Sequence, residues 1–300
     1  MERRTFLRNS LAGAGLVTGV GALSTRGEQG EAQAGKTPAA HLKICSQESR
    51  VSGKTFAEKI AKLDKWGAVG VELVGGSITA RRTEIKAALK GTNVSVSVCC
   101  GGAGGVAISS DKAEREKVVS SYREFLPVAG DLGAAGVIFV PAFNRHDQLV
   151  GKEAREVLVE ILGRVGEYAV KAGTCVVLEP LNRKEAYFLR QLADAASICR
   201  DVNSPGVAMM GDFYHMYFEE TSDEGAFMSA GPYLKHVHLG SIKRKLPGQD
   251  ARSFVSGFRG LKRIGYQGYV SLECGCIGDR DVETPKSFRF LEKQWAEATV

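Results

Sequence analysis

Residues 132–141, LGAAGVIFVP, contain the joint that decides the fold, because a small-residue turn there leads straight into an apolar run. Gly133 supplies the left-handed conformation that ends a helix, and the run Gly136 to Pro141 has the β-branched character of a strand. Similar joints occur at 66–70, WGAVG, and at 264–268, IGYQG. The three joints predict a repeated connection from helix to strand.

Working outward from these joints, the chain alternates strand-like and helix-like segments from His41 onward. The expected strands are Leu42 to Ser46, Val69 to Val74, Val94 to Cys100, Gly136 to Pro141, Thr174 to Glu179, Val207 to Asp212, His236 to Gly240 and Tyr269 to Cys274. The expected helices are Lys54 to Trp66, Thr79 to Lys90, Asp111 to Leu132, Lys152 to Ala172, Leu189 to Val202, Ala251 to Ile264 and Thr284 to Ala296, with a weaker one at Thr221 to Ala230.

Eight strand–helix repeats predict an α/β protein with one closed (β/α)8 TIM barrel. A doubly wound sheet would usually show a glycine-rich dinucleotide fingerprint after its first strand, and none follows Ser46. The glycine-rich run 101–105 lacks the lysine and hydroxyl spacing of a nucleotide loop. We therefore expect it to shape the mouth of the barrel, and we expect no nucleotide cofactor.

Composition and charge set the class of protein. The chain has 300 residues, of which 44% are hydrophobic, enough for one barrel domain of about 250 residues. Its net charge of +6 arises from 40 basic and 34 acidic residues that are spread along the chain. This pattern argues against nucleic acid or a membrane as a partner.

The N-terminal residues differ in character from the rest. Arg3 and Arg4 precede a weakly apolar stretch from Leu11 to Leu23, and 32–34 read AQA, a pattern suited to signal peptidase. This segment resembles a twin-arginine signal. We expect a signal peptide at 1–34, a linker at 35–40 and a catalytic barrel at 41–300. The twin-arginine export machinery would then be a partner, and the protein would reach the periplasm or cell envelope without stable membrane insertion.

Four residues at the ends of the last four expected strands carry the chemistry. They are Glu179, Asp212, His238 and Glu273. Any one alone is as well explained as a solvated loop residue or a helix cap. In a parallel barrel, however, consecutive strands present their carboxyl ends to one mouth. Three carboxylates and an imidazole suit a hard divalent cation, with Mn²⁺ preferred over Mg²⁺ and Co²⁺.

The motifs around these residues resemble the sugar isomerase/epimerase superfamily with a xylose-isomerase-like barrel, most closely its ketose 3-epimerase and hydroxypyruvate isomerase branches. They are LEPLNR at 178–183, GDFYHM at 211–216, HVHL at 236–239 followed by Arg244, and SLE at 271–273. The resemblance implies metal ligation by Glu179, Asp212, His238 and Glu273. It also implies substrate contacts from Glu185, His215 and Arg244.

The implied chemistry explains the residue types. Removing a proton beside a carbonyl leaves an enediolate, which a divalent cation stabilises. Glu179 and Glu273 on opposite faces of a sugar could take and return protons, giving epimerisation, whereas one carboxylate acting alone gives aldose–ketose isomerisation. His236 shares a strand face with His238 one layer lower, so we expect it to support the site by hydrogen bonding.

Three functions remain open from the sequence, all with a small carbohydrate as ligand. The leading hypothesis is a metal-dependent sugar isomerase or 3-epimerase. The alternative is an exported metal-dependent lyase or dehydratase acting on keto-sugars, inososes or 3-keto-glycosides. A third is a carbohydrate-binding barrel without turnover. The sugar, the native metal and the oligomeric state stay open.

Overall fold

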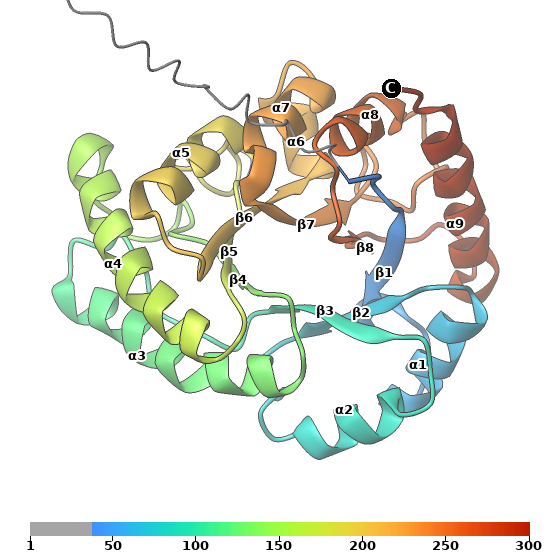
Figure 1. Ribbon diagram of the computed structural model, residues 1–300, viewed down its shortest axis with the longest axis horizontal. Helices are drawn as coiled ribbons and strands as arrows, with labels where there is room; N and C mark the ends of the chain where they lie inside the picture. Colours follow the sequence, from blue (N-terminus) through green and yellow to red (C-terminus); the bar gives the residue numbers. More distant parts are fainter. Residues whose placement is uncertain (1–37) are drawn as a thin grey trace, which may run out of the picture. The chain divides into compact units, whose positions relative to one another are not determined.

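A computed structural model of the protein describes residues 38–300. Eight parallel strands close into a barrel in chain order, with β8 paired to β1 (Figure 1). The strands are β1 (Lys43–Gln47), β2 (Gly70–Val74), β3 (Ser95–Cys100), β4 (Val137–Phe139), β5 (Val176–Leu178), β6 (Val207–Asp212), β7 (Leu234–Leu239) and β8 (Tyr269–Leu272). The predicted (β/α)8 TIM barrel is confirmed.

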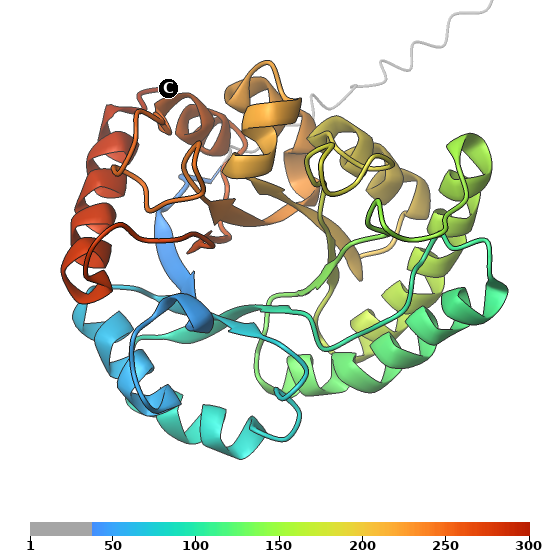
Figure 2. The same ribbon diagram turned by 180° about the vertical axis from the view of Figure 1, so that it is seen from behind.

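Helices surround the strands as an outer ring, which both views show (Figures 1 and 2). They are α1 (Phe56–Lys65), α2 (Arg82–Leu89), α3 (Lys112–Asp131), α4 (Gly151–Lys171), α5 (Leu192–Val202), α6 (Phe213–Glu219), α7 (Asp223–Ala230), α8 (Val255–Arg263) and α9 (Arg280–Glu297). Two short 3₁₀ turns lie at Glu48–Arg50 and Gly231–Tyr233. The weakly indicated helix in the sixth connection is present as α7.

Several helices differ from expectation: α5 begins at Leu192 rather than Leu189, and α8 begins at Val255 rather than Ala251. Helix α6 was not predicted; it begins directly after β6 because the Asp212 side chain accepts a hydrogen bond from the Tyr214 backbone and caps the helix. Helix α9 begins before the expected Thr284, since Asp279 caps its first turn and Pro285 lies inside the helix. In both cases an acidic residue caps the first turn of the helix.

The apolar interior has two parts. The larger core packs the outward faces of the strands against the helices. A smaller cluster occupies the barrel interior on the side of β3 to β6 and comprises Val98, Ile138, Cys175, Val177, Ala208 and Met210. The interior on the side of β7 and β2 is instead polar, with His236, His238 and Glu72 all fully buried. The buried polar groups of the interior therefore lie below the carboxyl ends of β7 and β2.

The predicted signal peptide, and the linker up to residue 37, lie outside the described residues, so this part of the domain organisation stays a prediction. Across residues 38–300, none of the helices combines the length and the apolar character required to cross a bilayer.

Candidate active site

The four residues predicted to share a metal converge at the carboxyl ends of the strands. Glu179 follows β5, Asp212 ends β6, His238 lies in β7 and Glu273 follows β8. Each offers one ligand atom, and these atoms lie within 4.8 Å of one another. From His238 Nδ1 the distances are 3.2 Å to Glu273 Oε2, 3.6 Å to Glu179 Oε1 and 3.9 Å to Asp212 Oδ2. The structure brings the four together; their role as ligands stays a prediction.

Two buried atoms of this cluster have no hydrogen-bond partner among the described residues. Asp212 uses Oδ1 to accept from the Tyr214 backbone at 2.7 Å, which leaves Oδ2 unpaired, and His238 Nδ1 is also unpaired. An unsatisfied buried polar atom costs about 1–3 kcal/mol. Asp212 Oδ2 and His238 Nδ1 lie 3.9 Å apart, so a cation coordinated by both atoms would satisfy them. The residues present therefore fit a divalent metal ion.

Glu72 holds the other ring nitrogen of His238. His238 Nε2 lies 2.9 Å from Glu72 Oε2, and His236 Nε2 lies 3.1 Å from the same oxygen. Burial opposes ionisation of Glu72, but the charge and hydrogen bonds of the two histidines outweigh it and hold the pKa of this carboxyl well below its usual value. With Nε2 engaged by Glu72, Nδ1 is the His238 atom available to a metal.

Gln47 connects the buried Glu72 carboxylate to Glu273 of the four-residue cluster. In the β1–β2 register Gln47 lies opposite Glu72, and its Nε2 donates at 2.9 Å to Glu72 and at 2.9 Å to Glu273. Sequence reasoning missed both Gln47 and Glu72. The available signal was a charged residue between Val71 and Leu73 in an otherwise apolar strand, since a fully buried carboxylate requires partners.

His236 lies where the sequence analysis expected it. It is fully buried, its ring centroid is 5.1 Å from that of His238, and it bonds Glu72 rather than joining the four-residue cluster. This geometry is compatible with a supporting role for His236, which stays a prediction.

The three residues expected to contact substrate border the cluster. Glu185 Oε1 lies 3.9 Å from His215 Nδ1 and 3.7 Å from Arg244 Nη1. The Asn182 backbone N–H donates to His215 Nδ1 at 3.2 Å. Because a backbone N–H can only donate, Nδ1 is the acceptor and the ring proton is on Nε2. His215 Nε2 lies 3.4 Å from Arg244 Nη1 and 3.6 Å from Asp212 Oδ2, at the edge of the cluster.

Arg244 spans the cluster from the loop after β7. Its guanidinium pairs with Glu273, lies 3.5 Å from Asp212 Oδ2 and lies over the Tyr214 ring at 4.6 Å. Its backbone φ of 51° is left-handed, a conformation that costs a non-glycine residue about 1–3 kcal/mol. Hydrogen bonds from Arg244 N to Ser241 O and from Gly275 N to Arg244 O, both 2.8 Å, hold it there.

The two candidate acid–base carboxylates have opposite pKa shifts. Burial raises the pKa of Glu179, more than the nearby His238 lowers it. Burial also acts on Glu273, but the nearby His238, together with Arg244, lowers its pKa to about 2. The two carboxyl groups thus lie in environments that shift their pKa values in opposite directions.

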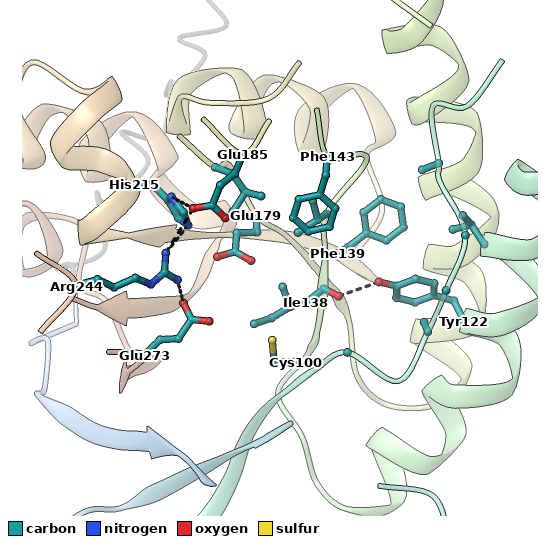
Figure 3. A pocket seen from close by; sticks show the side chains of 18 residues that line it. Cys100, Tyr122, Ile138, Phe139, Phe143, Glu179, Glu185, His215, Arg244 and Glu273 are labelled. Carbon is teal, nitrogen blue, oxygen red and sulfur yellow. Dashed lines mark hydrogen bonds and ion pairs between the residues drawn. The ribbon is translucent and has the colours of Figure 1, made fainter. Parts of the chain in front are cut away.

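A cavity of about 330 Å³ opens beside the cluster (Figure 3). Glu179, Glu185, His215, Arg244 and Glu273 line one side of it, and the labelled aromatic residues line the other. The predicted site residues other than Asp212, His238 and His236 thus border one cavity. This volume suits a small ligand.

Known proteins resemble this chain over most of its length. A family model described as xylose isomerase-like TIM barrel matches residues 60–294. A 3-dehydro-D-guloside 4-epimerase of Escherichia coli is 28% identical over 242 residues, covering 77% of this chain and 92% of that protein. A D-psicose 3-epimerase of Ruminiclostridium cellulolyticum is 29% identical over 267 residues, covering 83% and 90%. The crystal structure of a 3-keto-D-glucoside 4-epimerase from E. coli matches with a TM-score of 0.77 at 27% identity, covering 84% of this chain and 100% of that one.

Proposed function

Because this chain belongs to the xylose isomerase-like TIM barrel family, we propose that it is a divalent-metal-dependent sugar epimerase acting on a keto-sugar or keto-glycoside. The observation that carries the proposal is the pair of carboxylates, Glu179 and Glu273, placed beside the unpaired atoms of Asp212 and His238. The names of the relatives support the epimerase reading, since they include a guloside 4-epimerase and a psicose 3-epimerase.

Each group has a role in this proposal. Glu273 removes the proton from the carbon beside the substrate carbonyl, and Glu179 returns one to the opposite face. Glu179, Asp212, His238 and Glu273 would hold a divalent cation, Mn²⁺ in our proposal, and it would supply Lewis-acid stabilisation of negative charge on the substrate oxygens. His215 donates its Nε2 proton to a substrate oxygen, and Arg244 offers paired donors to neighbouring hydroxyls.

Hydrogen exchange tests the proposal directly. Purified protein with Mn²⁺ is incubated in D₂O with free ketoses, inososes and 3-keto-glycosides, and NMR follows label at the α-carbon and the product formed. We expect incorporation with conserved mass. Loss of water or release of an aglycone would show that the protein catalyses an elimination instead of an epimerisation. Binding without exchange would show that it is a carbohydrate-binding barrel without turnover.

Glu273→Gln is the matched variant, because it keeps the shape and a metal-binding oxygen but removes the base. We expect it to abolish incorporation while retaining the fold. Bound Mn²⁺ is measured in the same sample, so that loss of metal and loss of the base are separated. Wild-type exchange in a Mn²⁺-loaded Glu273→Gln protein would remove Glu273 from the acid–base role.

We also propose export, supported by the arginine pair and the AQA pattern near the N-terminus. A reporter fused after residue 40 should reach the periplasm of a bacterial host, and changing Arg3 and Arg4 to lysine should retain it in the cytoplasm. Equal export of both forms would contradict a twin-arginine route.

A further inference from the structure

The cavity beside the cluster has two chemically different halves. Carboxylates, His215 and Arg244 line the half next to β5–β8. The other half, on the side of β3 and β4, is lined by Val118, Tyr122, Ile138, Phe139 and Phe143. Figure 3 shows the charged side chains and the aromatic rings on opposite sides of the open space. One ligand that fills both halves must itself be polar at one end and apolar at the other.

The apolar half offers few hydrogen bonds to a ligand. The Tyr122 hydroxyl donates to the Ile138 carbonyl at 2.8 Å, so its polar atom is engaged inside the protein. The Gly104 N–H donates to the Ser121 hydroxyl at 2.9 Å, and the Ala107 N–H donates to the Pro141 carbonyl at 2.9 Å. A sugar hydroxyl placed against the apolar side chains of Val118, Ile138 and Phe143 would lose its hydration without gaining a partner.

The glycine-rich loop after β3 forms part of the lining of this apolar half and packs closely against α3. A Cβ at Gly102 would lie 2.5 Å from the Phe125 ring, and one at Gly105 would lie 2.7 Å from the Val118 side chain. Both glycines also have positive φ values, 103° and 95°. The loop therefore packs closely on α3 and presents a wall of small residues to the cavity.

We propose that the substrate is a glycoside of a keto-sugar, with the sugar ring against the carboxylates and an aromatic aglycone in the apolar half. This inference rests on the proposed epimerase function. A free monosaccharide carries hydroxyl groups on nearly every carbon, so it satisfies only the charged half. An aromatic aglycone instead meets the ring of Phe143, which is partly exposed at the cavity and with which aromatic groups pack favourably.

The test compares methyl and phenyl 3-keto-glucosides, which differ only in the aglycone. With Mn²⁺-loaded protein in D₂O, we expect kcat/KM for α-hydrogen exchange to be at least about tenfold higher for the phenyl glycoside, because its ring adds buried apolar area. Calorimetric binding of methyl and phenyl glucoside, which do not react, gives a second readout that does not depend on turnover.

Phe143→Asn is the informative variant, because Phe143 is half-buried at the cavity and its loss should leave the core intact. It should lower kcat/KM for the phenyl glycoside more than for the methyl glycoside and so remove the preference for phenyl. Phe290→Asn is the matched control, since Phe290 is also half-buried but lies on α9 and does not line the cavity; it should keep the preference.

The outcomes separate the two ideas. Exchange without a phenyl preference, or equal losses on both substrates in Phe143→Asn, overturns the aglycone site and keeps the epimerase. A phenyl preference in binding without any exchange overturns the epimerase and keeps the site. Absence of both overturns both.

Discussion

Glu72→Gln should weaken metal binding although Glu72 is not among the four clustered ligands. The substitution keeps the size of the side chain but replaces one carboxylate oxygen by an NH₂ group. His238 Nε2 lies 3.1 Å from Oε1 and 2.9 Å from Oε2, so it faces both positions. In the variant, the N–H of His238 must share the single remaining carboxamide oxygen with the N–H of His236. Otherwise the His238 imidazole must move its proton from Nε2 to Nδ1, and Nδ1 then has no lone pair for a metal.

The magnitude follows from these contacts. Glu72 is fully buried and accepts from His236, His238 and Gln47, so the change removes at least one buried hydrogen bond to a charged group. Such a bond contributes about 1.5–3 kcal/mol. Since about 1.4 kcal/mol is tenfold, we expect Mn²⁺ affinity to fall about 10- to 100-fold, as is typical when the partner of a metal-binding histidine is removed.

Calorimetric titration of Mn²⁺ into chelator-treated protein measures this directly, and circular dichroism checks the fold. Asp223→Asn is the control: Asp223 is also largely buried and pairs with Arg252 at 2.8 Å, but it lies on α7 outside the cluster. Its Mn²⁺ affinity should equal that of the wild type. A folded Glu72→Gln protein with wild-type affinity would refute the claim that Glu72 positions His238.

Three other substitutions test separate features of the structure. Arg244→Lys keeps the charge but loses the planar pair of donors, so KM should rise about tenfold in steady-state assays. Burial opposes the charged form of Glu219, but hydrogen bonds from Arg183 at 2.8 and 2.9 Å lower its pKa. Because the pKa of Glu219 is lower in the folded than in the unfolded protein, where it is about 4.3, its ionisation stabilises the fold at pH values above about 4.3. This stabilisation is lost as the pH falls through the pKa of the folded state. Glu219→Gln should therefore be less stable than the wild type at pH 7, and the gap in urea unfolding should close below about pH 4. Gly257→Ala should cost about 1–3 kcal/mol, because its Cβ would lie 2.4 Å from the Phe213 ring.

Each of these has a contradicting result. An unchanged KM in Arg244→Lys would show that a point charge suffices there. A stability gap for Glu219→Gln that is constant with pH would mean that its ionisation is not linked to folding. Gly163→Ala controls for Gly257→Ala, since a Cβ at Gly163 on α4 meets open space; equal unfolding midpoints for the two would exclude the clash.

Local patterns predicted the barrel well. The small-residue joint before β4 and its counterparts before β2 and β8 repeat along the chain, and a change from helical to strand periodicity follows each. Helix α6 escaped prediction because the aromatic run after Asp212 has no helical stripe, and its start depends on one side-chain cap.

The candidate cluster was predictable for a topological reason. Parallel strands in a barrel share one carboxyl edge, so Glu179, Asp212, His238 and Glu273 had to face the same mouth once the strand order was known. Glu72 was not predictable in this way. It meets His238 from across the barrel, 166 residues away in the chain, and which inward positions touch there depends on strand tilt and register.

The amino-acid sequence by itself determined the number of strands, their order and the edge at which the acidic residues gather, because these follow from local periodicity and from the geometry of parallel pairing. Only the tertiary structure decided that Glu72 and Gln47 support His238 and Glu273, and that an apolar wall faces the charged one. The contact of Glu72 with His238 joins β2 and β7, which are not neighbours in the barrel, and the apolar wall faces the charged one across the cavity, so both depend on how the barrel closes.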